Sequence, residues 1–259
     1  MELIGAEGFR IGFDLPLEAV SDWRGPEGGD VLCVTHGHPD HCGLLLRLQA
    51  LDLPRVSFDL VASDSVVDHF QGLWSGEKRA LHPVEAGEAI EVDGVRISAF
   101  KWEHMPLVPP ETGRALHYVM NLVRHPVQLA QVVTDGIGLP LAGPMLGYMV
   151  EMPEGMKVLN YAEGLHRLTE RGEVESVVER LQPDILLSAV EPEDLKAVER
   201  WVELIDAAHV FLYEAHRPWR ESFELEELDL DRFASRLDER MPSSEVIALT
   251  DPGTERSVE

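Results

Sequence analysis

Four side chains of types that bind metal ions fall within six residues of this sequence: His36, His38, Asp40 and His41. They directly follow Val31 to Thr35, a largely apolar run that predicts a buried strand. Imidazoles two residues apart point to one side of an extended chain, and Gly37 between them removes steric obstruction. Pro39 stiffens the turn, so Asp40 and His41 are expected at the start of the next helix. Three imidazoles and one carboxylate in one small volume predict a metal site, suited best to zinc, with iron or manganese as alternatives.

The composition excludes several classes of function. The 259 residues include 47 acidic and 22 basic side chains, a formal net charge of -25. So acidic a surface repels nucleic acid and anionic membranes. The N-terminus lacks a basic segment followed by an apolar run, so we expect no signal peptide. No apolar stretch reaches about 18 residues, so we expect no membrane span and a cytoplasmic location. The two cysteines, Cys33 and Cys42, are interpreted as small buried residues rather than ligands or nucleophiles.

Strand and helix patterns alternate along most of the chain. Hairpins are predicted at residues 2–14, 89–100 and 148–161, and strands with helices at 31–51, 56–73, 174–189, 192–213 and 229–249. This order predicts an α/β fold with two sheets packed face to face and helices outside, a four-layer αββα sandwich. Residues 105–145 are rich in Pro, Gly and Met. They are interpreted as an insertion with some helix near 114–124.

Thr35 to His41 resembles the His-x-His-x-Asp-His motif of the metallo-β-lactamase fold superfamily. Further stretches are similar to other parts of that family, namely residues 8–16, 87–104, 147–162, 183–190 and 213–216. The resemblance implies a single domain over residues 1–259, with α/β halves at about 1–104 and 146–259 around the insertion. Among the branches, the chain is most similar to the ascorbate-6-phosphate lactonase-like metal-dependent hydrolases.

The resemblance also implies two divalent metal ions and assigns their ligands. His36, His38 and His104 would hold the first ion, and Asp40, His41 and His216 the second, with Asp40 also the expected catalytic carboxylate. The insertion follows His104 directly, so we expect it to form a lid or one wall of the substrate pocket. Additional core or a contact between copies of the chain is the alternative.

One part of the chain departs from the family pattern. The family has Gly-Asp-Thr after the strand equivalent to residues 157–161, and that Asp bridges the two metals. Here the sequence is Ala-Glu-Gly-Leu-His over residues 162–166. Glu163 is one residue early but has a longer reach, so it is the first candidate for the bridge. His166 and Asp135 are the other two.

These residues predict a hydrolase whose metal-activated hydroxide attacks a small-molecule lactone, ester or phosphodiester. Two other functions stay open. One is a degenerate, non-catalytic metal-binding protein, because the usual bridging Asp is lost; the other is a di-iron redox protein of the same fold. We expect a small-molecule substrate and neither a nucleic acid nor a membrane partner. Homo-oligomerisation is left open.

Overall fold

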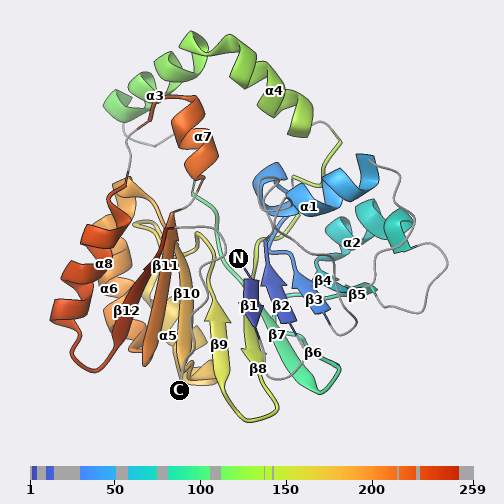
Figure 1. Ribbon diagram of the computed structural model, residues 1–259, viewed down its shortest axis with the longest axis vertical. Helices are drawn as coiled ribbons and strands as arrows, with labels where there is room; N and C mark the ends of the chain where they lie inside the picture. The colour runs from blue at the N-terminus through green and yellow to red at the C-terminus, as the bar shows by residue number, and fades with distance from the viewer. Residues whose placement is uncertain are drawn as a thin grey trace. The chain divides into compact units, whose positions relative to one another are not determined.

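The computed structural model describes residues 2–4, 10–14, 30–50, 58–74, 81–105, 112–136, 138–141, 143–214, 216–225 and 228–250. These residues form two sheets with helices, and the chain divides into two compact units. Unit 1 comprises Met1–Trp102 and Gly138–Asn160, and unit 2 comprises Glu103–Ile137 and Tyr161–Glu259. Figure 1 labels the α-helices and strands of both units.

Unit 1 contains a five-stranded sheet in the order β1-β2-β3-β4-β5. Its strands are β1 (Glu2–Ile4), β2 (Arg10–Phe13), β3 (Asp30–Cys33), β4 (Asp59–Ala62) and β5 (Leu81–Pro83). The first two pair antiparallel, which confirms the predicted opening hairpin, although its turn lies outside the described residues. The other neighbours all pair parallel. A parallel β2–β3 pair places the residues that follow both strands at one edge of the sheet.

Helices of unit 1 bury the apolar residues of this sheet. They are α1 (Pro39–Ala50), α2 (Asp64–Phe70) and the short 3-10 helix η2 (Gln71–Trp74). Their side chains share one core cluster with strands β3 and β4, formed by Leu32, Val34, Cys42, Leu45, Phe58, Leu60, Ala62, Val66, Val67, Phe70 and Leu73. Each fully buried Leu or Phe contributes about 1.5–3 kcal/mol relative to exposure. This core fixes where β3 ends and α1 begins.

The second sheet has seven strands in the order β12-β11-β10-β9-β8-β7-β6. Unit 1 supplies β6 (Ala89–Val92), β7 (Val95–Lys101), β8 (Leu146–Glu151) and β9 (Lys157–Asn160), which pair antiparallel. Both predicted hairpins in this region are confirmed. Because β7 and β9 each run antiparallel to β8, their C-terminal ends lie at the same edge of the sheet.

Unit 2 supplies the three parallel strands of that sheet and the helices that cover them. The strands are β10 (Ile185–Val190), β11 (His209–Glu214) and β12 (Glu245–Leu249). The helices are α5 (Arg171–Leu181), the 3-10 turn η3 (Pro192–Asp194), α6 (Leu195–Ile205) and α8 (Leu230–Arg240). Amphipathic spacing explains α6 and α8, because Val198, Trp201 and Val202 on α6 and Phe233 and Leu237 on α8 are buried.

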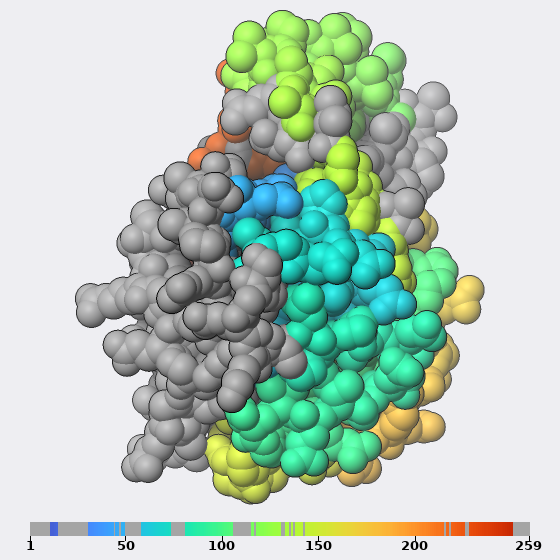
Figure 2. Space-filling view, turned by 90° about the vertical axis from the view of Figure 1, so that its right-hand side faces the viewer, coloured from blue at the N-terminus to red at the C-terminus, as the bar shows by residue number. Residues whose placement is uncertain are grey.

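The predicted insertion forms two helices rather than one. Helix α3 (Thr112–Arg124) confirms the expected helix, whereas α4 (Pro126–Gly136) is a helix that was not predicted from the sequence. Large apolar side chains are exposed on this pair of helices, whose surface is green in Figure 2: Leu116, Val119, Met120, Val123, Val127 and Val133. These side chains therefore lie outside the core of unit 2. Among the described residues, no helix is long and apolar enough to cross a membrane.

Candidate metal centre

The segment from His36 to His41 is a tight connection between β3 and α1. The His38 carbonyl accepts hydrogen bonds from the backbone N–H groups of His41 and Cys42, both at 3.0 Å, so the helix begins directly after His38. Pro39 occupies the first helical position, where its fixed φ suits the helix and its missing N–H costs nothing. Asp40 and His41 therefore lie in the first turn of α1, as predicted.

Gly37 has a steric role that the structure makes concrete. A Cβ added there would lie 2.6 Å from the Pro140 carbonyl oxygen and 2.7 Å from the Pro140 Cγ. Separations under 3.0 Å are essentially never seen for real Cβ atoms. The predicted obstruction thus comes from the backbone of the segment that leads back from the insertion, rather than from the histidines themselves.

A buried carboxylate that sequence reasoning missed organises this segment. Asp14 accepts hydrogen bonds from the Thr35 backbone N–H at 2.8 Å and from the Thr35 hydroxyl at 2.7 Å. The Thr35 Oγ1 lies 2.9 Å from His36 Nδ1, and the Asp14 Oδ2 lies 3.3 Å from His41 Nδ1. Because the Thr35 hydroxyl gives its proton to Asp14, it accepts from the His36 Nδ1–H. Both rings therefore keep Nε2 as the nitrogen with a lone pair for a cation.

Sheet pairing explains why Asp14 lies there. Phe13 of β2 is in register with Cys33 of β3, and the Asp14 N–H donates to the Cys33 carbonyl at 3.2 Å. Asp14 also has a φ of 44°, in the left-handed region where Asp and Asn are enriched among residues other than glycine. A lone Asp after a short strand carries no motif, so only the pairing of β2 with β3 could have revealed it.

His104 and His216 each follow a strand of the second sheet. His104 comes three residues after β7, and its Nδ1–H donates to the Met105 carbonyl at 2.5 Å, which leaves Nε2 for a cation. His216 comes two residues after β11, with a φ of 53°. The centroids of the two rings are 6.3 Å apart. The two rings therefore lie near each other, although β7 and β11 are not neighbours in the sheet.

His216 also faces a half-buried carboxylate. Its Nε2 lies 3.5 Å from Glu191 Oε1, and Glu191 follows directly after β10. Burial raises the pKa of Glu191, an effect that the nearby His216 opposes. The left-handed backbone of His216 is strained for a residue with a side chain, and such strain clusters at functional sites.

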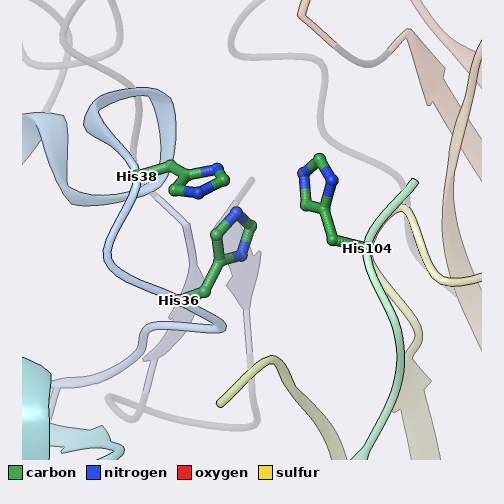
Figure 3. A group of neighbouring side chains, drawn as sticks. All are labelled: His36, His38 and His104. Atoms are coloured by element: carbon green, nitrogen blue, oxygen red, sulfur yellow. The ribbon is translucent and has the colours of Figure 1, made fainter. Parts of the chain in front are cut away.

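The structure brings the predicted ligands together in three groups. The ligand atoms within each group all lie within 4.8 Å of one another. The groups are His36, His38 and His104; Asp40, His41 and His216; and His36, His41 and Glu163. Figure 3 shows the rings of the first group pointing toward one another. Zinc–nitrogen bonds are about 2.0–2.1 Å long, so small side-chain rotations would bring such atoms onto one ion.

The donor set fits a divalent metal centre. Five imidazoles and two carboxylates offer the nitrogen and oxygen ligands that zinc, manganese and iron accept. Glu163 shares one group with His36 from the first predicted ligand set and His41 from the second. A residue that would bridge two ions needs neighbours from both ligand sets, so Glu163 stays the first candidate for the bridge. Metal binding by these seven residues stays a prediction.

The other two candidates for the bridge lie elsewhere. His166 belongs to none of the three groups, and its ring nitrogens contact backbone groups. Asp135 lies in the last turn of α4, and its side chain is outside what the structure describes. Cys33 and Cys42 are buried free thiols, and burial holds both of their pKa values well above the ordinary value. They are therefore poor nucleophiles, which agrees with their interpretation as small buried residues.

Comparison with solved structures defines the class of fold. The metallo-β-lactamase fold protein YhfI from Bacillus subtilis aligns over 95% of this chain and 85% of its own, with a TM-score of 0.56 and 11% identity. A Cronobacter sakazakii metallo-β-lactamase with the HARLDQ motif aligns over 93% and 85%, with a TM-score of 0.38 and 11% identity, and its S60 mutant has a TM-score of 0.37 and 13% identity over the same shares. No family pattern and no curated protein matches the sequence.

The chain therefore has the metallo-β-lactamase fold, as predicted from residues 35–41. It is a mixed α/β protein in which the similarity to YhfI extends over nearly the whole length. The fold alone does not set an activity, and the grouped ligands fit a divalent metal centre. These matches offer no support for the narrower ascorbate-6-phosphate lactonase-like branch.

Proposed function

We propose that this protein is a metal-dependent hydrolase that binds two divalent ions, zinc in the first place, and acts on a small-molecule lactone, ester or phosphodiester. The observation that carries the proposal is the sharing of ligands among the three groups. Glu163 lies with His36 and His41, which belong to two different ligand sets. A chain with one isolated histidine cluster would not supply a shared carboxylate.

Bound divalent ions supply Lewis acidity and make a water acidic enough to act as a nucleophile near neutral pH. The side chains of this protein would orient that chemistry. Asp14 and Thr35 fix the tautomers of His36 and His41. The Asp40 side chain is 40% exposed and lies 3.7 Å from His41 Nε2, so its carboxylate can also exchange a proton with solvent. No nucleophilic Ser or Cys is needed.

The insertion supports the proposal of a lid or pocket wall. Within unit 2, Tyr118 of α3 hydrogen-bonds with Trp219 of α7 (Arg217–Ser222), and His125 packs against Phe223 with ring centroids 6.0 Å apart. Helix α7 begins at the residue after His216, and α3 belongs to the segment that follows His104. The helix pair is thus tied to the two segments that follow His104 and His216. Its exposed apolar residues suit a partly apolar substrate.

Metal analysis of the purified protein, followed by hydrolysis assays, tests the proposal. We expect about two zinc or manganese ions per chain, and turnover of at least one member of a panel of lactones, thioesters, esters and phosphodiesters. Coloured protein with two irons and no hydrolysis would favour the redox alternative. Absence of tightly held metal would favour the degenerate binding protein, and either result would reject the hydrolase.

A further inference from the structure

A buried histidine outside the ligand groups contacts the backbone beside one of the ligands. His166 is 4% exposed, and its Nε2 lies 2.6 Å from the Glu103 carbonyl oxygen, one residue before His104. Its Nδ1 lies 3.2 Å from the Leu168 backbone N–H, which can only donate. The Nδ1 atom therefore accepts, and Nε2 carries the proton that is donated to Glu103. This neutral tautomer satisfies both ring nitrogens.

The loop that carries His166 is itself held at several points. The His166 carbonyl accepts a hydrogen bond from Trp201 Nε1 at 3.0 Å, and Trp201 is 1% exposed on α6. The backbone N–H and the guanidinium of Arg167 each donate to Asp194 Oδ1 at 3.0 Å, and Asp194 is buried. The loop is therefore anchored to α6 and to the 3-10 turn before it. The backbone of His166 is thus held in one place, so its side chain can hold another segment in position.

Glu163 lies at the N-terminal end of the loop that carries His166. The Thr169 hydroxyl donates to the Gly164 carbonyl at 2.6 Å and accepts from the His166 N–H at 3.2 Å, which closes the loop on itself. Ala162 at its start has a φ of 46°. Glu163 and the support of His104 thus belong to one closed segment of seven residues, 163–169.

We propose that His166 is a positioning residue. Its bond to the Glu103 carbonyl fixes the backbone orientation at Glu103, and this orientation determines the direction of the His104 side chain relative to Glu163. This inference rests on the proposed function, because it takes His104 as a metal ligand. A bond from a histidine to the main chain beside a ligand acts on orientation rather than on charge. Loss of the bond between His166 and the Glu103 carbonyl lets the backbone of residues 103–105 rotate. His104 Nε2 then moves away from the ligand atoms of His36 and His38.

Two amide replacements separate the two ring nitrogens. In His166→Gln the amide nitrogen can take the place of Nε2 and donate to the Glu103 carbonyl. In His166→Asn the shorter amide takes the place of Nδ1, so it can keep the bond within the loop but cannot reach Glu103. His209→Asn is the matched control, because His209 lies at the start of β11 and pairs with Glu245.

The experiment measures zinc affinity by competition with a chelating dye, and the visible spectrum of the cobalt-loaded protein. We expect His166→Asn to bind zinc about 10–100-fold more weakly with an altered cobalt spectrum, while His166→Gln and His209→Asn resemble wild type. Thermal unfolding of the metal-free proteins checks that both variants at residue 166 fold.

The outcomes separate the two levels of the proposal. If wild-type protein binds no zinc, the proposed function fails. If wild-type protein binds zinc and His166→Asn matches it in affinity and spectrum, His166 has no positioning role. Equal losses in Asn and Gln variants would also overturn the inference, because the bond to Glu103 would then not be the cause.

Discussion

The candidate ligands come from two kinds of region that are built differently. Residues 36–41 supply four of them from one short connection between β3 and α1. The other three, His104, Glu163 and His216, are single residues two or three positions after β7, β9 and β11. One carboxylate, Asp14, supports two histidines of this contiguous segment. It acts on His36 through the Thr35 hydroxyl and lies directly beside His41. Of the isolated ligands, His104 contacts the Met105 carbonyl and His216 contacts Glu191.

The difference teaches where the site is robust and where it is adjustable. In the contiguous segment the backbone path itself brings the ligands together, so removing one support disturbs several ligands at once. At the isolated positions, contacts such as the Met105 carbonyl with His104 and Glu191 with His216 act one at a time. We therefore expect variants of the contiguous segment to have larger effects than variants of the isolated supports.

The largest effect is expected from His38→Ala, which removes a ligand outright. Zinc affinity should fall by more than the about 100-fold typical of losing a supporting residue, and any hydrolysis should disappear with it. His69→Ala on α2, outside the ligand groups, is the control. Retained turnover in His38→Ala would break the assignment of the contiguous segment.

Asp14→Asn should rank second. Asn tolerates the left-handed backbone at this position, so the change tests the carboxylate rather than the fold. We expect metal affinity to fall about 10–100-fold, because the tautomers of His36 and His41 are no longer fixed. Calorimetric titration with zinc measures this loss. An affinity like that of wild type would mean that the backbone path alone orients the histidines.

Glu163→Gln should change the number of ions more than the affinity for the first one. The His36, His38 and His104 group remains intact, so we expect one tightly held ion per chain instead of two. Elemental analysis after dialysis gives the ratio. Glu175→Gln on α5, an exposed partner of Arg171, should keep both ions. Two retained ions in Glu163→Gln would remove Glu163 from its bridging role.

Glu191→Gln should have the smallest effect. The contact with His216 is 3.5 Å long, and burial already raises the pKa of Glu191, so little ionic attraction is lost. We expect less than about 10-fold weaker metal binding, with Glu175→Gln on α5 again as the control. A loss as large as that of Asp14→Asn would show that isolated ligands depend on their supports as strongly as the contiguous ones.

The fold was predictable where local patterns are strong. The hairpin over residues 89–100 carries the turn Asp93-Gly94, and both residues have positive φ as that turn requires. Helix α4 was missed because Val127 and Val133 are exposed, and none of the side chains that the structure describes on this helix is buried. Strand β5 has three residues and ends in Pro, and α7 has six residues, so neither gives a periodic signal.

Site residues that lie next to one another in the sequence could be predicted, and single residues far from their partners could not. Residues 36–41 form a motif, and that motif indicated the fold that the structure confirms. Asp14 and His166 are single polar residues whose partners lie 21 and 63 positions away, so their contacts depend on sheet pairing and on loop closure. Only long-range structure can reveal such partners, because their sequence surroundings resemble those of any buried polar residue.

Gly37 also limits how this protein can change over evolutionary time. Its position is one of the two variable positions in the motif, yet here the Pro140 carbonyl leaves no room for a methyl group. A descendant chain can acquire Ala or Ser there only after residues 138–141 take another route. Substitutions at residue 37 and within residues 138–141 should therefore arise together among related sequences. A variant with a shortened insertion should likewise accept a larger residue at position 37.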